Sequence, residues 1–275
     1  MIVLRGESSL SPEQRIQYIM RAMSSWSQRR KRLYISVIVV VIAVPAVFLA
    51  YHSFYTAPTC FDGLMNGTEQ GIDCGGACQK LCASAFLPPR FDWARFEKVA
   101  PGLYNLAAYI ENPNGGAGAR NVPFHMTLYD SRGVKIADVP GTVTLPPHRN
   151  TLAFLPAVRV GENIPVATSF EFKFTSTPDW QKEADPLKNL VITDKQFVDD
   201  GAGSSLEVTL MNNNVKPIAR FNVYVVLYDK DKNAVGFSKT VIDGMAGNAV
   251  TQAPFTWSNN HGGSVISQEI LPVAE

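Results

Sequence analysis

FNVYVVLYD, residues 221–229, and VPFHMTLYD, residues 122–130, are the stretches that decide the fold. Both are rich in β-branched and aromatic residues, which favour an extended chain. Each ends in Leu-Tyr-Asp, and a short polar turn and a second extended run follow it. This order predicts a β-hairpin at both places.

The segments around the two hairpins also match each other. LAAYIEN at 106–112 corresponds to LEVTLMN at 206–212, and LPPHRNTLAF, which ends at Phe154, corresponds to MAGNAVTQAPF, which ends at Phe255. A unit repeated at a fixed spacing is the mark of duplicated structure. Short strands punctuated by turns over about 90 residues favour a β-sandwich. We therefore expect a mainly β fold with two tandem β-sandwich domains, the first at 91–178 and the second, together with the joint that precedes it, at 179–275.

Two prolines, in the segments 176–179 and 184–186, bracket Trp180 between the expected domains. Prolines this close predict a short, semi-rigid joint rather than a flexible tether. From this joint we expect the two sandwiches to lie end to end as a stalk.

All four cysteines of the chain lie in the segment 56–90, within a region too small to bury a core: Cys60, Cys74, Cys78 and Cys82. An even number of clustered cysteines predicts two disulfides formed in an oxidising compartment, with their connectivity open. The spacing lacks the Cys-x2-Cys pairs of common zinc sites, which disfavours zinc.

The same module carries side chains with hard oxygen ligands of the kind that calcium prefers: Asp62, Asn66, Glu69 and Asp73. Their spacing does not match an EF-hand loop, and carboxylates among glycines are also typical of tight turns. A calcium site is therefore one hypothesis and a set of structural turns is the other. No other cofactor is expected. Asn66-Gly67-Thr68 is also a glycosylation acceptor in a eukaryotic host.

Leu33–Tyr51 is an apolar run without a charged residue. As a helix it is roughly 28 Å long, which is close to the thickness of a bilayer's hydrocarbon core. Tyrosines flank it, as is typical of membrane interfaces. We expect a single transmembrane helix at 33–55, which serves as an uncleaved signal-anchor because the basic region before it is too long for a signal peptide.

A basic cluster, Arg29-Arg30-Lys31-Arg32, precedes this run directly. By the positive-inside rule the N-terminus is cytoplasmic, and the C-terminal domains are extracytoplasmic, in the cell envelope. The paired cysteines expected on the outer side agree with this orientation.

The arm at 1–32 is expected to be a basic amphipathic helix. Ser11 is in place as an N-cap, with Pro12 at the first helical position and Gln14 for a capping box. Apolar residues recur from Ile16 to Trp26 at helical spacing. Such a helix lies on the inner leaflet, packs on a cytoplasmic partner, or is a solvated lead-in to the span.

The cysteine segment resembles a signature of bacterial and other surface proteins, Cys-x-Asp-Gly-x-x-Asn-Gly-x-Glu-x-Gly-x-Asp-Cys-Gly-Gly-x-Cys, of which Asp73-Cys74-Gly75-Gly76 is the most specific part. The repeated Leu-Tyr-Asp hairpin resembles FxLYD-type immunoglobulin-like domains, with Met126 and Val225 where that family prefers Phe. The order of the parts resembles uncharacterised single-span bacterial envelope proteins. The resemblance implies immunoglobulin-like sandwiches without established catalysis and names no ligand.

No catalytic motif stands out in the sequence. The four histidines, His52, His125, His148 and His261, fall at the membrane interface, in a strand and in turns, and there is no Gly-x-Ser-x-Gly nucleophile elbow. The acidic pairs Asp199-Asp200 and Asp229 with Asp231 are more typical of solvated turns than of metal sites. The basic cluster is explained by topology, so nucleic acid is not expected as a partner. We expect no enzymatic activity.

Two classes of function follow from these features. In the first, the protein is a structural or interaction component of the envelope that binds other envelope proteins or a surface polymer. In the second, it is a transmembrane sensor or accessory subunit that couples an outer ligand to a cytoplasmic or intramembrane partner. The sequence leaves the oligomeric state open.

Overall fold

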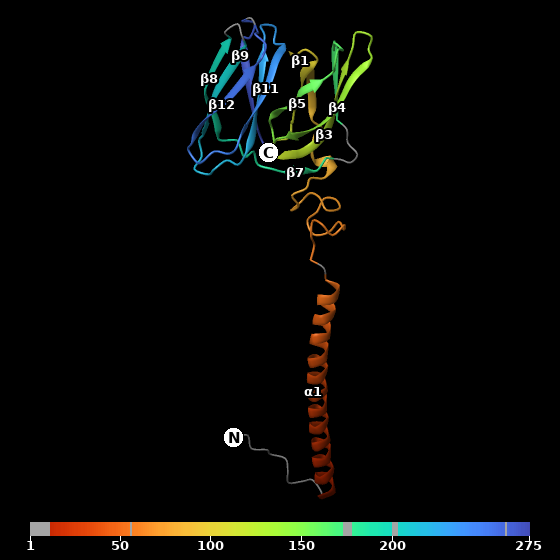
Figure 1. Ribbon diagram of the computed structural model, residues 1–275. Coiled ribbons are helices and arrows are strands. Elements are labelled where there is room, and N and C mark those ends of the chain that lie inside the picture. Colours follow the sequence, from red (N-terminus) through yellow and green to blue (C-terminus); the bar gives the residue numbers. More distant parts are fainter. Residues whose placement is uncertain (1–11, 56, 173–177, 200–202, 262) are drawn as a thin grey trace. The chain divides into compact units, whose positions relative to one another are not determined.

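The computed structural model describes the chain from Pro12 to Glu275 except residues 56, 173–177, 200–202 and 262 (Figure 1). The chain divides into two compact units, residues 1–58 and residues 59–275. Ser11, Asp200 and the start of the predicted joint, Ser176 and Thr177, lie outside the described residues.

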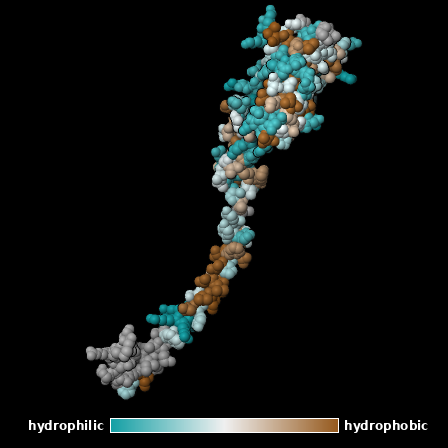
Figure 2. Space-filling view, turned by 90° about the vertical axis from the view of Figure 1, so that its left-hand side faces the viewer, coloured by the Kyte–Doolittle hydropathy of each residue, from teal (hydrophilic) through white to brown (hydrophobic). Residues whose placement is uncertain are grey.

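The first unit is one uninterrupted helix, α1, which spans Pro12–Phe54 and contains Pro45. It begins at the predicted proline, but the expected arm and the expected span are one element rather than two. No glycine or proline interrupts residues 13–44, so nothing breaks the helix between them. One segment of the described residues, Trp26–Phe54, is long and apolar enough to cross a membrane. Figure 2 shows it as a hydrophobic band with a hydrophilic patch at its N-terminal side.

The second unit starts with the cysteine module, which has little regular structure beyond the 3-10 turn η1, Ala83–Ala85. Two disulfides cross-link it, as predicted: Cys60 to Cys78 and Cys74 to Cys82. The module is also tied to the first sandwich. The amide of Leu81 donates to the Trp180 carbonyl at 2.8 Å, and the ring of Phe86 stacks on Trp180 with centroids 4.7 Å apart.

A three-stranded and a four-stranded antiparallel sheet form the first sandwich. One has the order β1-β2-β5, and the other has the order β4-β3-β6, with β7 also paired to β3. The strands are β1 Arg90–Ala100, β2 Leu103–Glu111, β3 Ala117–Tyr129, β4 Lys135–Leu145, β5 Asn150–Arg159, β6 Ala167–Phe172 and β7 Trp180–Lys182.

The second sandwich has the same arrangement. Its sheets have the orders β12-β9-β8 and β11-β10-β13, so that β8 to β13 take the places of β1 to β6. The strands are β8 Leu190–Asp199, β9 Ser204–Asn212, β10 Phe221–Tyr228, β11 Ala234–Ile242, β12 Val250–Trp257 and β13 Ser267–Ala274. The predicted mainly β fold class is confirmed, and the two hairpins that decided it are β3-β4 and β10-β11.

Each sandwich has its own apolar core between its two sheets. Leu106, Phe124 and Leu145 are fully buried in the first core, and Val208, Phe221 and Phe255 in the second. Trp180 lies in the first core and its strand β7 pairs with β3, so residues 180–182 belong to the first sandwich. The segment that was expected as the joint thus contains a strand of the first sandwich.

A third apolar cluster lies between the two sandwiches, and it contradicts the expected end-to-end stalk. Ala107 and Tyr109 of β2 and Leu152 of β5 meet Val226 of β10 and its neighbours in this cluster. The sheets β1-β2-β5 and β11-β10-β13 therefore pack face to face, and the four sheets form successive layers (Figure 1). A stalk would leave these apolar side chains in water, whereas packing removes them from it.

Candidate functional site at the interface between the sandwiches

The interface is formed by two central strands, β2 and β10, whose successive side chains point alternately into their own core and toward the other sandwich. In β2, Leu106, Ala108 and Ile110 point into the first core, while Ala107 and Tyr109 point to the second sandwich. In β10, the odd-numbered residues from Phe221 to Leu227 point into the second core, while Val226 points to the first sandwich. Both strands are consequently buried on both faces, which is why both read as nearly continuous apolar runs.

Aromatic rings fill the centre of the interface. The ring of Trp93 in β1 stacks on Tyr109 with centroids 5.5 Å apart, and it stacks on Phe237 of β11 at 6.1 Å. Phe237 is 1% exposed although its strand forms the edge of its own sheet. The first sandwich therefore covers a side chain that the second alone would leave in water.

One carboxylate joins the two sandwiches through two tyrosines. The Tyr109 hydroxyl donates to Glu269 Oε1 at 2.7 Å, and the Tyr228 hydroxyl donates to Glu269 Oε2 at 2.9 Å. Asn150 Nδ2 donates to the Tyr109 oxygen at 2.6 Å. Burial is the larger cause, and the nearby Glu269 the second, that raises the pKa of Tyr109 and of Tyr228. Both phenols therefore stay protonated and serve as donors.

An arginine holds the segment that links the sandwiches. Arg149 Nε donates to Asp185 Oδ2 at 2.6 Å, and a second guanidinium nitrogen donates to the carbonyl of Leu187 at 3.0 Å. Leu187 is 1% exposed and belongs to the second core. The joint is thus fixed by a charge-assisted contact at one end and by a buried side chain at the other.

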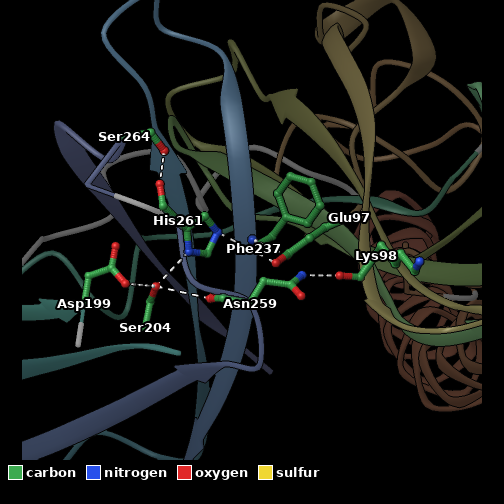
Figure 3. A network of polar contacts seen from close by, with 8 residues as sticks. All are labelled: Glu97, Lys98, Asp199, Ser204, Phe237, Asn259, His261 and Ser264. Carbon is green, nitrogen blue, oxygen red and sulfur yellow. Dashed lines mark hydrogen bonds and ion pairs between the residues drawn. The ribbon is translucent and has the colours of Figure 1, made fainter. Parts of the chain in front are cut away.

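A buried polar network forms another part of the interface (Figure 3). Glu97 of β1 faces His261, which lies in the loop between β12 and β13, with Glu97 Oε1 and His261 Nε2 3.8 Å apart. Their side chains are 8% and 7% exposed. The Phe237 amide donates to Glu97 Oε2 at 3.2 Å, and Asn259 donates to the backbone carbonyl of Lys98.

Burial sets the protonation of this pair. It raises the pKa of Glu97 to about 7, against the hydrogen bonds from Phe237 and Asn259. It also lowers the pKa of His261, and a hydrogen bond with the Val235 backbone and the charge of Asp199 oppose this shift. Both shifts favour the state in which the acid is protonated and the imidazole neutral.

His261 lies close to a serine and an aspartate, the residue types of a hydrolase triad, but the serine is buried. Ser204 Oγ lies 2.8 Å from His261 Nδ1, and Asp199 Oδ1 lies 3.4 Å from the same hydroxyl. Ser204 is 4% exposed, so a substrate carbonyl cannot reach its hydroxyl in this conformation. The geometry fits a structural network and not an open nucleophile.

The four calcium candidates act as hydrogen-bond partners within the module. Asp62 accepts from the amides of Thr59 and Leu64, Asp73 accepts from the Gly63 amide through both oxygens, and Glu69 accepts from the Asn66 amide. These hydrogen bonds fit the alternative of structural turns. They fix the shape of the module, while calcium binding there stays a prediction.

Among the residues that the structure describes, one group of three metal-ligand side chains lies close together: Cys60, Glu69 and Cys78. Both sulfurs of this group are joined in a disulfide, so they are not available as thiolate ligands. The structure does not bring Asp62 and Asp73 into this group.

The histidines singled out in the sequence have separate roles. His125 Nδ1 lies 2.9 Å from Asp138 Oδ1 on the outer face of β3, His148 lies in a turn at φ 51°, and His52 lies in α1. His261 lies in the loop between β12 and β13, where a turn was expected, and its side chain is buried at the interface. Glu97 and Glu269 were not singled out at all. The continuous apolar runs of β2 and β10 were the available signal for the interface, because only a strand covered on both faces needs them.

No family model and no curated protein sequence matches the chain. Three solved structures resemble it weakly. A β-glucuronidase from glycoside hydrolase family 2 has a TM-score of 0.24 and 9% identity over 64% of this chain and 24% of that chain. Red sea bream transglutaminase has a TM-score of 0.20 and 10% identity over 65% and 28%. A putative β-galactosidase from Bacteroides fragilis has a TM-score of 0.21 and 13% identity over 64% of this chain and 33% of that chain. The chain thus spans a third or less of these proteins, and the low TM-scores carry no argument about function.

Proposed function

We propose that the chain is a non-enzymatic, single-pass membrane protein of the cell envelope that presents two immunoglobulin-like sandwiches, packed against each other, to other envelope proteins or to a surface polymer. The observation that carries the proposal is the combination of one apolar helical segment, Trp26–Phe54, with a disulfide-linked β unit in the same chain. Disulfides persist in oxidising compartments, so this unit belongs on the outer side.

Further support comes from the charges and from the motifs. Arg29–Arg32 precedes the uncharged part of the helix, which favours a cytoplasmic N-terminus. The module's Asp73-Cys74-Gly75-Gly76 and the hairpins that end in Leu-Tyr-Asp resemble envelope proteins with FxLYD-type domains. We assign the chain to such a group as part of the proposal, with the sandwiches as a tandem repeat.

Reporter fusions to the full chain, made in a bacterial host, test the topology. Green fluorescent protein at the N-terminus is expected to fluoresce, and alkaline phosphatase at the C-terminus is expected to be active. The reverse pattern would refute the orientation. Affinity purification in mild detergent then tests the function: enrichment of envelope proteins that bind through residues 59–275 supports it, and robust turnover of a substrate by the purified protein refutes the non-enzymatic assignment.

A sensor or accessory subunit is the second candidate, and the continuity of α1 favours it. Residues 12–32 and the apolar segment form one helix, so a rotation or shift of the segment moves the basic arm with it. Site-specific cross-linking from the exposed Gln28 decides between the two candidates. A stoichiometric cytoplasmic partner supports the sensor, and cross-links to lipid alone support the envelope component.

A further inference from the structure

The contact between Glu97 and His261 lies where it can control the packing of the two sandwiches. Glu97 belongs to the first sandwich, while Ser204, Asn259 and His261 belong to the second (Figure 3). Both members of the pair are nearly inaccessible to water. Any net charge on the pair is therefore a buried charge, which is costly unless a nearby group of opposite charge compensates it.

Few other charges are near enough to compensate. Around the pair, β8 contributes Asp199, whose carboxylate lies within 3.4 Å of the Ser204 hydroxyl, and β1 contributes Lys98, whose backbone carbonyl accepts from Asn259. Uncharged groups also contact the pair. They include Ser204 of β9, the Phe237 amide of β11, and Trp257 of β12, whose ring meets that of His261 edge-on with centroids 6.2 Å apart.

The interface can open without loss of either sandwich. The first and second cores are separate from the cluster between the sandwiches, and no strand is shared between the sandwiches. If the pair becomes charged, parting the sandwiches brings water to it at a lower cost than unfolding a core. A local opening of this kind is the natural response of two packed domains to a buried charge.

We propose that Glu97 and His261 form a pH-sensitive latch between the two sandwiches, which pack tightly while the pair holds one titratable proton and part when that proton is lost or a second is gained. The proposal does not depend on the membrane anchor or on the partners proposed above. It predicts a closed state near pH 6 and progressive opening above pH 7.

Distance measurements by double electron–electron resonance on the full chain in detergent test the latch. Spin labels are placed at Thr142→Cys on β4 and Glu207→Cys on β9, two exposed positions on different sandwiches. The four native cysteines are paired in disulfides, so only the new thiols react. We expect one narrow distance at pH 6. At pH 8.5 a longer distance is expected beside it, with a ratio of open to closed that rises up to about ten-fold per pH unit.

Two variants make the result specific. Glu97→Gln keeps the shape of the side chain and cannot ionise, so it should show the short distance at both pH values. Glu111→Gln is the control, because Glu111 is 39% exposed and pairs with Arg90 at the end of β2, and it should open as the wild type does. An unchanged wild-type distance between pH 6 and 8.5, or the same opening in Glu97→Gln, would overturn the proposal.

If Glu97→Gln does not fold, the wild-type titration still decides, together with His261→Gln. This variant lacks the second proton site. It should open at alkaline pH, and it should stay closed as the pH is lowered into the acidic range in which the wild type opens. A His261→Gln protein that opens at acidic pH as the wild type does would contradict the latch.

Discussion

Glu97 Oε1 of the first sandwich and His261 Nε2 of the second lie 3.8 Å apart, and both side chains are buried where the two sandwiches meet. The pKa of each group is shifted in the folded chain, mainly by burial. The free energy of unfolding should therefore carry the titration of both groups, in addition to the opening proposed above.

The Glu97 carboxyl is expected to make the protein less stable as the pH rises. Its pKa is about 7 in the folded chain and 4.5 ordinarily, so its contribution is fully present below pH 4.5 and lost as the pH rises through 7. The loss amounts to about 3 kcal/mol at most. Urea unfolding of the wild type and of Glu97→Gln between pH 5 and 8.5 measures it, and the variant should be the more stable protein at pH 8.5.

His261 acts in the opposite direction. Its pKa is lowered in the folded chain, so its contribution is present above pH 6.5 and is lost as the pH falls. The two slopes together predict greatest stability at mildly acidic pH. A stability that rises steadily from pH 5 to 8.5 in the wild type would contradict the assignment for Glu97.

The local patterns of the sequence predicted the elements well, and the packing between them less well. Val223, Val225 and Tyr228 mark a strand by composition alone, and the prolines and acidic turns mark where strands end. The start of α1 followed from Pro12, and the disulfides followed from the cysteine count. These are properties of short segments, which a sequence carries directly.

The interface depends on residues far apart in the chain, and local patterns do not contain that information. Glu97 stands in an ordinary alternating run, and its contacts in the second sandwich, the Phe237 amide and His261, lie 140 or more residues later in the chain. The prolines around Trp180 indicated a stiff joint, but stiffness does not say in which direction the chain leaves it. The direction is set by Tyr109, Val226 and Phe237. Their side chains lie on the sheet faces that point away from the two cores, and they are removed from water only when the sandwiches pack on each other.

Phe237→Ala is expected to uncouple the two sandwiches. The side chain is 1% exposed and stacks on Trp93 across the interface, so its removal leaves a cavity there that costs about 3–5 kcal/mol. Because neither sandwich core is touched, the cost falls on the interface. Calorimetry should show one thermal transition for the wild type and two for the variant. Val241→Ala on the same strand, at 36% exposure, should keep the single transition.

Glu269→Gln is expected to lower the free energy of unfolding by about 1–3 kcal/mol, because two hydroxyls now donate to a carboxylate and the amide offers only one acceptor oxygen. Chemical denaturation of the variant and of Tyr228→Phe, singly and together, measures the coupling. The two effects should be less than additive. Glu207→Gln, on the exposed face of β9, should have no effect. Full additivity of the two effects would show that the hydrogen bond between Tyr228 and Glu269 does not contribute to stability.

Gly76→Ala is expected to prevent the cysteine module from closing its native disulfides. Gly76 has φ 56°, and a Cβ at this position would lie 1.7 Å from the carbonyl oxygen of Thr68, a backbone atom that cannot move without breaking the turn. Gly63 is the matched control, since its φ of 72° carries a similar strain of about 1 kcal/mol but its Cβ would meet nothing within 4 Å. Thiol alkylation and non-reducing peptide mass spectrometry should find Cys60–Cys78 and Cys74–Cys82 in the wild type and in Gly63→Ala, and free or mispaired thiols in Gly76→Ala. Native pairing in Gly76→Ala would mean that the turn of the module differs from the one described, because no alanine fits against Thr68 as it stands.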